Sequence, residues 1–150
     1  MRLFFLATLL PVVLSCSSRF YCPPQPATEE EQEAIFREWY QTFFMDRDIP
    51  AAYHRFVAEN YIQHGPYGSN GREANMLFVL DYLDNVANFT PITMAFGGGH
   101  GWIHQKMVLK DRPRPISVMQ HVRYEGTCLM EHWEVLQELP EDAPNPIAMF

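Results

Sequence analysis

The chain has 150 residues, of which 47% are hydrophobic and 19% charged, a composition that suits one packed domain and argues against disorder. Its 11 Lys and Arg against 18 Asp and Glu give a net charge of -7, which disfavours a nucleic-acid binder because such proteins need a field of positive charge. Aromatic residues reach 14%, so we expect a core or a pocket rich in rings.

Residues 1–18 have the pattern of a secretory signal peptide. One basic residue, Arg2, precedes an apolar run that ends in small residues. This run is too short for a transmembrane helix, which needs about 20 apolar residues. The sequence therefore predicts a secreted protein without a stable membrane span.

Two cysteines remain after removal of that segment. Cys22 lies in a Pro-rich arm, residues 19–27, and Cys128 begins a predicted strand. In an oxidising compartment they could pair as a disulfide, and the alternative is two separate thiols. Asn88, followed by Phe89 and Thr90, fits an N-glycosylation acceptor, which agrees with secretion.

Three helices are predicted after the arm. Thr28 and Glu31 form a capping box, and apolar side chains then recur at helical spacing to about residue 44. Asp48 caps a second helix, with Val57 on its apolar stripe. A third helix is expected to turn these side chains inward: Met76, Leu77, Leu80, Tyr82, Leu83 and Val86.

After Asn88 the pattern changes to strands separated by short turns that contain Gly or Pro. The predicted strands are 91–96, 102–109, 116–124 and 128–139. Consecutive strands with such turns imply an antiparallel sheet. Residues 28–150 therefore predict one α+β domain, in which three helices cover a curved antiparallel sheet of about four to six strands to form a cone-shaped barrel.

Histidines are the candidates for acid-base chemistry, because His exchanges protons near neutral pH. The six are His54, His64, His100, His104, His121 and His132. Their spacing has no zinc signature, and the chain has no Gly-rich phosphate loop, so neither a metal nor another cofactor is predicted. Because side chains alternate along a strand, the neighbours Gln120 and His121 point to opposite faces, as do His132 and Trp133.

Several motifs resemble the SnoaL-like polyketide cyclase group of the nuclear transport factor 2-like superfamily. They are Tyr61-Ile62-Gln63-His64, Gly71-Arg72-Glu73, Glu131-His132-Trp133-Glu134-Val135-Leu136-Gln137 and the closing Met149-Phe150. The resemblance covers about residues 29–150 and implies a cone-shaped α+β barrel. Cyclases of this group close a ring by an intramolecular aldol-type condensation. In them a pocket acid or base, usually Asp partnered by His, handles protons beside a carbonyl.

The resemblance implies roles for particular residues. His104 matches the strand His of the group, and the Asp position falls on Gln120, which can hold a carbonyl or enol oxygen but cannot take a proton at neutral pH. Glu134 stands where the motif of the group has Asp. Either His104 or His64 then acts alone as the base, or the protein binds a ligand without the usual chemistry.

Two functional hypotheses follow. The first is a cofactor-independent cyclase, isomerase or lyase acting on an apolar, carbonyl-bearing metabolite of polyketide or terpenoid type. In it His104 moves the proton and Gln120 orients the oxygen. The second is a secreted, non-catalytic binder of small ligands. The side chains expected to line the pocket are Tyr61, His64, Trp102, His132 and Trp133. The expected partners are a small apolar metabolite and a second copy in a homodimer, with no nucleic acid.

Overall fold

The computed structural model describes residues 19–145 and 147–150, so the predicted signal peptide lies outside the described residues. Its helical elements are α1 (Glu29–Tyr40), the π-helical turn η1 (Gln41–Met45), α2 (Ile49–Phe56) and α3 (Arg72–Leu83). Its strands are β1 (Val57–Gln63), β2 (Val86–Gly97), β3 (His100–Leu109), β4 (Ile116–Glu125) and β5 (Cys128–Glu138). No helix in the described ranges has the length and apolar character needed to cross a membrane.

The helices begin at the predicted caps. The Thr28 side chain accepts from the Glu31 N–H and the Glu31 carboxylate accepts from the Thr28 N–H, which forms the capping box of α1. Asp48 caps α2 through the N–H of Ala51. The π-helical turn after α1 is not apparent in the apolar spacing. It places Phe44 in the core, and turns of this kind are frequent at functional sites.

Two details of the helix prediction were wrong. Val57 and Val86 begin strands instead of extending α2 and α3. Leu77 and Leu80 of α3 are exposed, although their spacing suggested a buried stripe. The helix packs through a narrower face than the sequence pattern indicates, because its apolar residues from Met76 to Leu80 are consecutive and so occupy every side of the helix.

The sheet has the order β1-β5-β4-β3-β2 and is mixed, not antiparallel throughout. Neighbours from β2 to β5 are antiparallel, but β1 pairs in parallel with β5. The sequence did not reveal β1, because Glu59 and Asn60 interrupt the alternation that marks a half-buried strand. The edges β1 and β2 do not pair with each other, so the sheet is curved and open instead of closed as a barrel. Pro91 is tolerated in β2 because an edge strand can lose one N–H donor beside an irregularity in its register.

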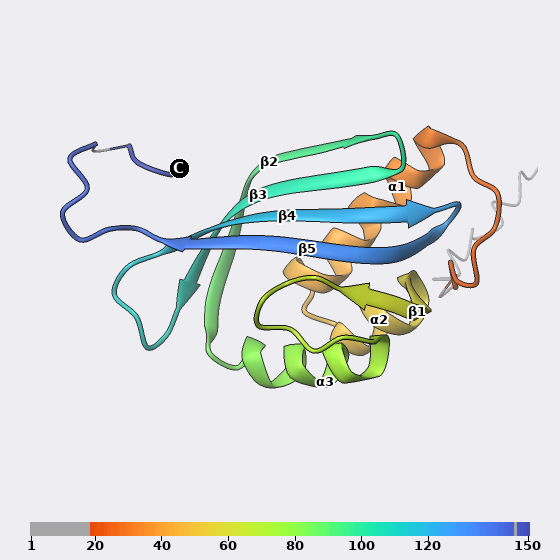
Figure 1. Cartoon of the computed structure of the whole chain (residues 1–150), viewed down its shortest axis with the longest axis horizontal. Coiled ribbons are helices and arrows are strands. Elements are labelled where there is room, and N and C mark those ends of the chain that lie inside the picture. Colours follow the sequence, from red (N-terminus) through yellow and green to blue (C-terminus); the bar gives the residue numbers. More distant parts are fainter. Residues whose placement is uncertain (1–18, 146) are drawn as a thin grey trace, which may run out of the picture.

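The two faces of the sheet differ in their surroundings. Figure 1 shows α1 crossing one face of the sheet and α2 and α3 lying below β1. Ile103 and Val118 face the helices and are buried. We call this the inner face and the opposite one the outer face. Trp102, Met119 and Val135, on β3, β4 and β5, lie on the outer face and are 40%, 46% and 69% exposed.

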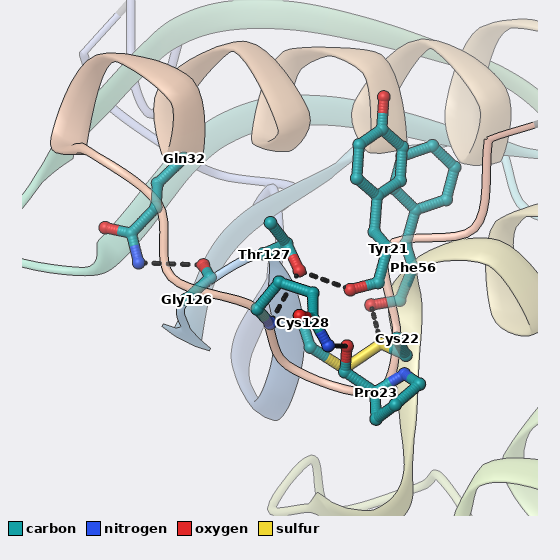
Figure 2. The surroundings of a disulfide bond; sticks show 9 residues. Tyr21, Cys22, Pro23, Gln32, Phe56, Gly126, Thr127 and Cys128 are labelled. Atoms are coloured by element: carbon teal, nitrogen blue, oxygen red, sulfur yellow. Dashed lines mark hydrogen bonds between the residues drawn. A yellow bond between two sulfur atoms is a disulfide. The ribbon is translucent and has the colours of Figure 1, made fainter.

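The N-terminal arm is fastened to the turn between β4 and β5. Cys22 and Cys128 form a disulfide that joins residues 106 positions apart, and Figure 2 shows the bonds around it. The Thr127 hydroxyl donates to the Tyr21 carbonyl, and the Tyr21 ring stacks on Phe56 with ring centroids 4.9 Å apart. The arm is therefore part of the packed domain.

Replacement of Gly101 tests the contact between the inner face and α1. A Cβ atom at this position would lie 2.6 Å from Cε2 of the fully buried Phe36 ring. We expect Gly101→Ala to lower the free energy of unfolding by about 1–3 kcal/mol, the usual cost of overpacking a core. Gly97→Ala on β2 is the matched control, since a Cβ there meets nothing within 4 Å. Equal urea midpoints for the two variants would contradict the packing described.

Candidate active site

A cavity lies between the inner face of the sheet and the helices. Aromatic side chains line much of it, from Trp39, Phe43 and Phe44 at the end of α1 and in η1 to Phe78 and Tyr82 on α3. The space open to the centres of water molecules is about 80 Å³. Polar side chains on its wall include Tyr53, Tyr61, Gln63, Asn75, Gln120, His132 and Glu134.

Of the described residues that line this cavity, Glu134 is the one with a carboxylate side chain. It lies on β5 directly opposite Gln120 of β4, and both side chains share the inner face. Among the described residues, no group forms an ion pair or a hydrogen bond with the Glu134 carboxylate. Burial raises its pKa above the ordinary value of 4.5. This group can therefore take up and release a proton closer to neutral pH than an exposed Glu.

Two tyrosines stand near Glu134 as neutral phenols. Burial raises the pKa of both Tyr53 and Tyr61 well above 10, and the charge of Glu134 raises each further. The Asn75 Nδ2 donates to the Tyr53 hydroxyl at 2.6 Å, so the Tyr53 hydrogen is free to donate elsewhere. Asn75 itself is 1% exposed, and its Oδ1 has no hydrogen-bond partner among the described residues. The Tyr53 hydroxyl thus supplies a neutral donor on the cavity wall, and Asn75 holds it in place.

A chain of hydrogen bonds crosses the inner wall beside these groups. The Gly65 N–H donates to Gln63 Oε1 at 2.8 Å, and Gln63 Nε2 lies 3.1 Å from His132 Nδ1. His132 Nε2 lies 2.8 Å from Gln120 Oε1. Burial, with smaller effects of His121 and His64, lowers the pKa of His132 to about 4. His132 is therefore neutral at pH 7.

The depressed pKa of His132 predicts a loss of stability in acid. The unfolded chain binds a proton at this side chain below its ordinary pKa of 6.5, whereas the folded state does so only below about 4. Stability is therefore fully present above pH 6.5 and falls as the pH drops toward 4. The stability lost between pH 6.5 and pH 4 amounts to roughly 3 kcal/mol.

Chemical denaturation at intervals from pH 7 to pH 4 measures this loss, with His132→Asn as the comparison. Carboxylates titrate in both proteins, so the contribution of His132 is the difference between their pH slopes. Parallel slopes for the wild type and the variant would contradict the buried, neutral state of His132.

Two glycines bring the loop of residues 64–71 close to the polar groups. A Cβ atom at Gly65 would lie 2.7 Å from Glu134 Oε1, and one at Gly68 would lie 2.7 Å from Asn75 Oδ1. Such distances are much shorter than real Cβ contacts, so a side chain at either position would force Glu134 or Asn75 to shift, and glycine lets the loop approach them this closely. The loop forms the roof of the polar part of the cavity.

Some of the site residues predicted from the sequence line the cavity, and others lie on the outer face of the sheet. Tyr61, Gln120 and His132 line the cavity together, but His104 lies on the outer face, where its Nε2 is 2.9 Å from the Ser117 hydroxyl. The reason is the alternation of β3, in which Ile103 and Gln105 are fully buried on the inner face and His104 between them must point away. The role of base in the cavity is therefore no longer assigned to His104.

His64, Trp102 and Trp133 also lie outside the cavity. Their rings form a stacked row on the outer face together with those of His121 and His100. Ring centroids are 4.4 Å apart between His64 and Trp133, 4.6 Å between Trp133 and His121, and 5.4 Å between His121 and Trp102. His64 Nε2 further pairs with Glu131 at 2.8 Å. None of these rings is placed to touch a ligand in the cavity, so the expectation that they line it is corrected.

Sequence reasoning missed Glu134, Gln63, Asn75 and Tyr53 as site residues. For Glu134 a signal was present, because it lies two residues after His132 and so shares its strand face. For Asn75 and Tyr53 no signal was present, because a polar residue within an apolar helix does not reveal which side chains it will meet. Among the described residues, no group of three or more His, Cys, Asp and Glu side chains is arranged to hold a metal ion.

Comparison with solved structures identifies the fold. The chain is similar to a nuclear transport factor 2-like protein of unknown function from Burkholderia xenovorans, with a TM-score of 0.64 and 13% identity over 75% of this chain and 88% of that one. It is similar to a steroid delta-isomerase from Pseudomonas aeruginosa, with a TM-score of 0.62 and 12% identity over 79% and 86%. A candidate polyketide cyclase from Acidithiobacillus ferrooxidans gives a TM-score of 0.59 and 15% identity over 71% and 88%.

No protein-family model and no curated protein matches the sequence. The structural likeness nevertheless confirms the nuclear transport factor 2-like fold that the resemblance implied, with three helices on a curved sheet. At these identities the likeness concerns the fold, and such folds host many chemistries.

Proposed function

We propose that this chain of the nuclear transport factor 2-like fold is a cofactor-independent isomerase, cyclase or lyase. It moves a proton next to the carbonyl of a small apolar metabolite of polyketide or terpenoid type. One observation carries the proposal: the half-buried carboxylate of Glu134, which has no hydrogen-bond or ion-pair partner among residues 19–145 and 147–150, faces a cavity lined by aromatic rings and neutral hydrogen-bond donors. Such a cavity suits an apolar ligand, and the raised pKa of Glu134 suits a general base.

The proposed reaction uses groups that lie on one side of the cavity. The Glu134 carboxylate takes a proton from the carbon next to a ligand carbonyl, and the electron pair of that C–H bond moves toward the carbonyl oxygen. The resulting enolate oxygen accepts hydrogen bonds from neutral donors such as the Tyr53 hydroxyl or the Gln120 amide. Return of the proton from Glu134 to another carbon gives an isomer. Alternatively, the enolate carbon attacks a second carbonyl of the ligand, the oxygen of that carbonyl takes up the proton from Glu134, and a ring closes.

The names of two structural neighbours, a steroid isomerase and a candidate polyketide cyclase, support this class of chemistry. Exchange of protons for deuterons beside the carbonyl of small cyclic and aryl ketones, followed by NMR in D2O, tests it without knowledge of the natural substrate. We expect exchange above the buffer rate with at least one ketone. Ketones that bind in the cavity but exchange no faster than in buffer would overturn the catalytic proposal.

A second candidate function is the binding of a small carbonyl compound without turnover. Gln120 favours it, because an amide stands where the SnoaL-like group has its usual acidic residue. The same NMR experiment separates the two functions, since a binder shifts the ligand signals without exchanging its protons.

Secretion is part of the proposal, and the disulfide supports it. Disulfides form and persist in oxidising compartments, and Cys22 with Cys128 forms one. The N-terminal sequence of the protein from its native cells is the test. A chain that begins between residues 16 and 19 supports secretion, and one that begins at Met1 overturns it. Intact mass measures any sugar at Asn88, which is exposed on the edge strand β2.

We also propose a homodimer that buries the outer face. Trp102, Met119 and Val135 place exposed apolar side chains on one face of three adjacent strands, with Met119 directly opposite Val135, and exposed apolar side chains gathered on one face favour an interaction site. Light scattering after size exclusion should give twice the chain mass for the wild type and a smaller mass for Val135→Glu. A wild-type monomer at micromolar concentration would overturn the proposal.

A further inference from the structure

The chain of hydrogen bonds along the cavity wall determines which atom donates and which accepts at every step. We infer that His132 is a positioning residue that holds the Gln120 amide with its NH2 toward the cavity, so that this subsite takes a hydrogen-bond acceptor of the ligand, such as a ketone oxygen. This inference adds the ligand chemistry of one subsite to the proposed function. It rests on that function only in placing the ligand in this cavity.

The direction starts from a group that can only donate. The backbone N–H of Gly65 donates to Gln63 Oε1 at 2.8 Å, which fixes the other end of the Gln63 amide as NH2. That NH2 lies 3.1 Å from His132 Nδ1, so Nδ1 must accept. A neutral imidazole that accepts at Nδ1 carries its hydrogen on Nε2, and Nε2 donates to Gln120 Oε1 at 2.8 Å. The Gln120 Nε2 is then the last member of the chain.

The surroundings keep His132 neutral, which the argument requires. It contacts the uncharged amides Gln63 from β1 and Gln120 from β4, and the charges of His121 and His64 oppose its protonation. An imidazolium would donate from both nitrogens and would force the Gln63 amide to turn. The Gly65 N–H would then face an NH2 group and lose its acceptor. Neutral His132 is thus the state compatible with all three hydrogen bonds.

The free end of the chain lies on the strand next to that of the proposed base. Gln120 lines the cavity. Its Oε1 accepts from His132, and its Nε2 forms no hydrogen bond with the described residues. It lies opposite Glu134 on the neighbouring strand, where Cβ atoms are about 4.5–5.5 Å apart. A ligand carbonyl that accepts from Gln120 therefore presents the adjacent carbon on the side of the Glu134 carboxylate. A ligand that offers a hydrogen at this point would leave the Gln120 NH2 unpaired.

Nitrogen-15 NMR of the intact protein tests the direction of the chain. With labelled histidine at pH 7, and with His132→Gln used to assign the signal, we expect the neutral tautomer that carries its hydrogen on Nε2. The tautomer with hydrogen on Nδ1, or an imidazolium, would overturn the inference. This measurement needs no ligand and no turnover, so it is independent of whether the proposed catalysis occurs.

Two probes of nearly equal shape test the acceptor subsite. Acetophenone has a ketone oxygen where ethylbenzene has a methylene, and we expect the wild type to bind acetophenone about tenfold more tightly, the effect of one good hydrogen bond. The Gln120 side-chain signals should shift with acetophenone. Failure of acetophenone to bind, or equal affinity for both probes, would overturn the subsite.

Variants separate positioning by His132 from a purely structural role. Gln120→Leu should abolish the preference for acetophenone. His132→Phe should reduce it several-fold because Gln120 can then rotate, whereas His132→Gln, which can still accept and donate, should restore part of it. His104→Asn on the outer face is the control and should leave the preference unchanged. An undiminished preference in folded His132→Phe would show that His132 does not position Gln120.

Discussion

Glu134→Gln should lower the rate of proton exchange beside a ketone carbonyl by about 10²–10⁴-fold, the usual contribution of a positioned general base. Gln has nearly the shape of Glu but cannot accept a proton at neutral pH. The affinity for the same ketone should change little, since the aromatic wall and the neutral donors remain. Exchange rates by NMR in D2O and affinities by titration measure the two effects separately.

Glu131→Gln is the matched control for this variant. Glu131 lies on the same strand, but its carboxylate points to the outer face and pairs with Arg123 and His64. The exchange rate of this control should equal that of the wild type. A Glu134→Gln variant that keeps exchange within threefold of the wild-type rate would remove Glu134 from the mechanism.

The same substitution should raise stability near neutral pH. Because the pKa of Glu134 is raised by folding, the folded state binds a proton more tightly than the unfolded chain does. Wild-type stability therefore falls as the pH rises from 4.5 through the raised pKa, and Glu134→Gln lacks this loss. We expect a gain of about 1 kcal/mol, as is common when a functional group that destabilises the fold is removed.

Loss of the disulfide should have the second large effect, a decrease of about 2–4 kcal/mol in the free energy of unfolding. The bond joins Cys22 to Cys128, which are 106 positions apart, so it restricts most of the unfolded chain. Long closed loops of this size give the largest entropic stabilisation in the chain-entropy model. The double variant Cys22→Ala, Cys128→Ala also releases the arm from the wholly buried position of Cys128.

A reductant provides the internal control. Dithiothreitol should lower the urea midpoint of the wild type toward that of the double variant and should leave the double variant unchanged. Wild-type protein whose midpoint does not respond to the reductant under denaturing conditions would contradict the disulfide. Thr127→Val keeps the disulfide but removes two hydrogen bonds of the arm, one to the Tyr21 carbonyl and one from the Gln25 N–H, and should cost about 1–3 kcal/mol.

The sequence predicted elements whose signals are local. The capping box at Thr28 and the Asp48 cap specify where α1 and α2 begin, because a cap is a contact between residues three positions apart. The four long strands followed from alternation and turns. β1 escaped prediction because Glu59 and Asn60 interrupt its alternation, and its place beside β5 depends on a pairing between segments about 70 residues apart.

The choice of active-site residues was a different problem. Alternation places His104 and Gln105 on opposite faces of β3. In the same way it places Trp133 on one face of β5 and His132 with Glu134 on the other. It does not say which face packs against the helices, so an exposed row of His and Trp rings and a buried polar wall look alike in sequence.

The opening composition predicted one acidic domain rich in rings, and the structure locates those rings in two places. Some line the cavity, from Trp39 to Phe89, and others stack on the outer face, from His64 to Trp102. The sequence by itself determined the α+β class, the helix caps and the pairs of residues that share a strand face. The tertiary structure decided which face is buried, because that depends on where α1, α2 and α3 pack against the sheet and on the register between strands. Glu134, and not His104, faces the cavity for that reason.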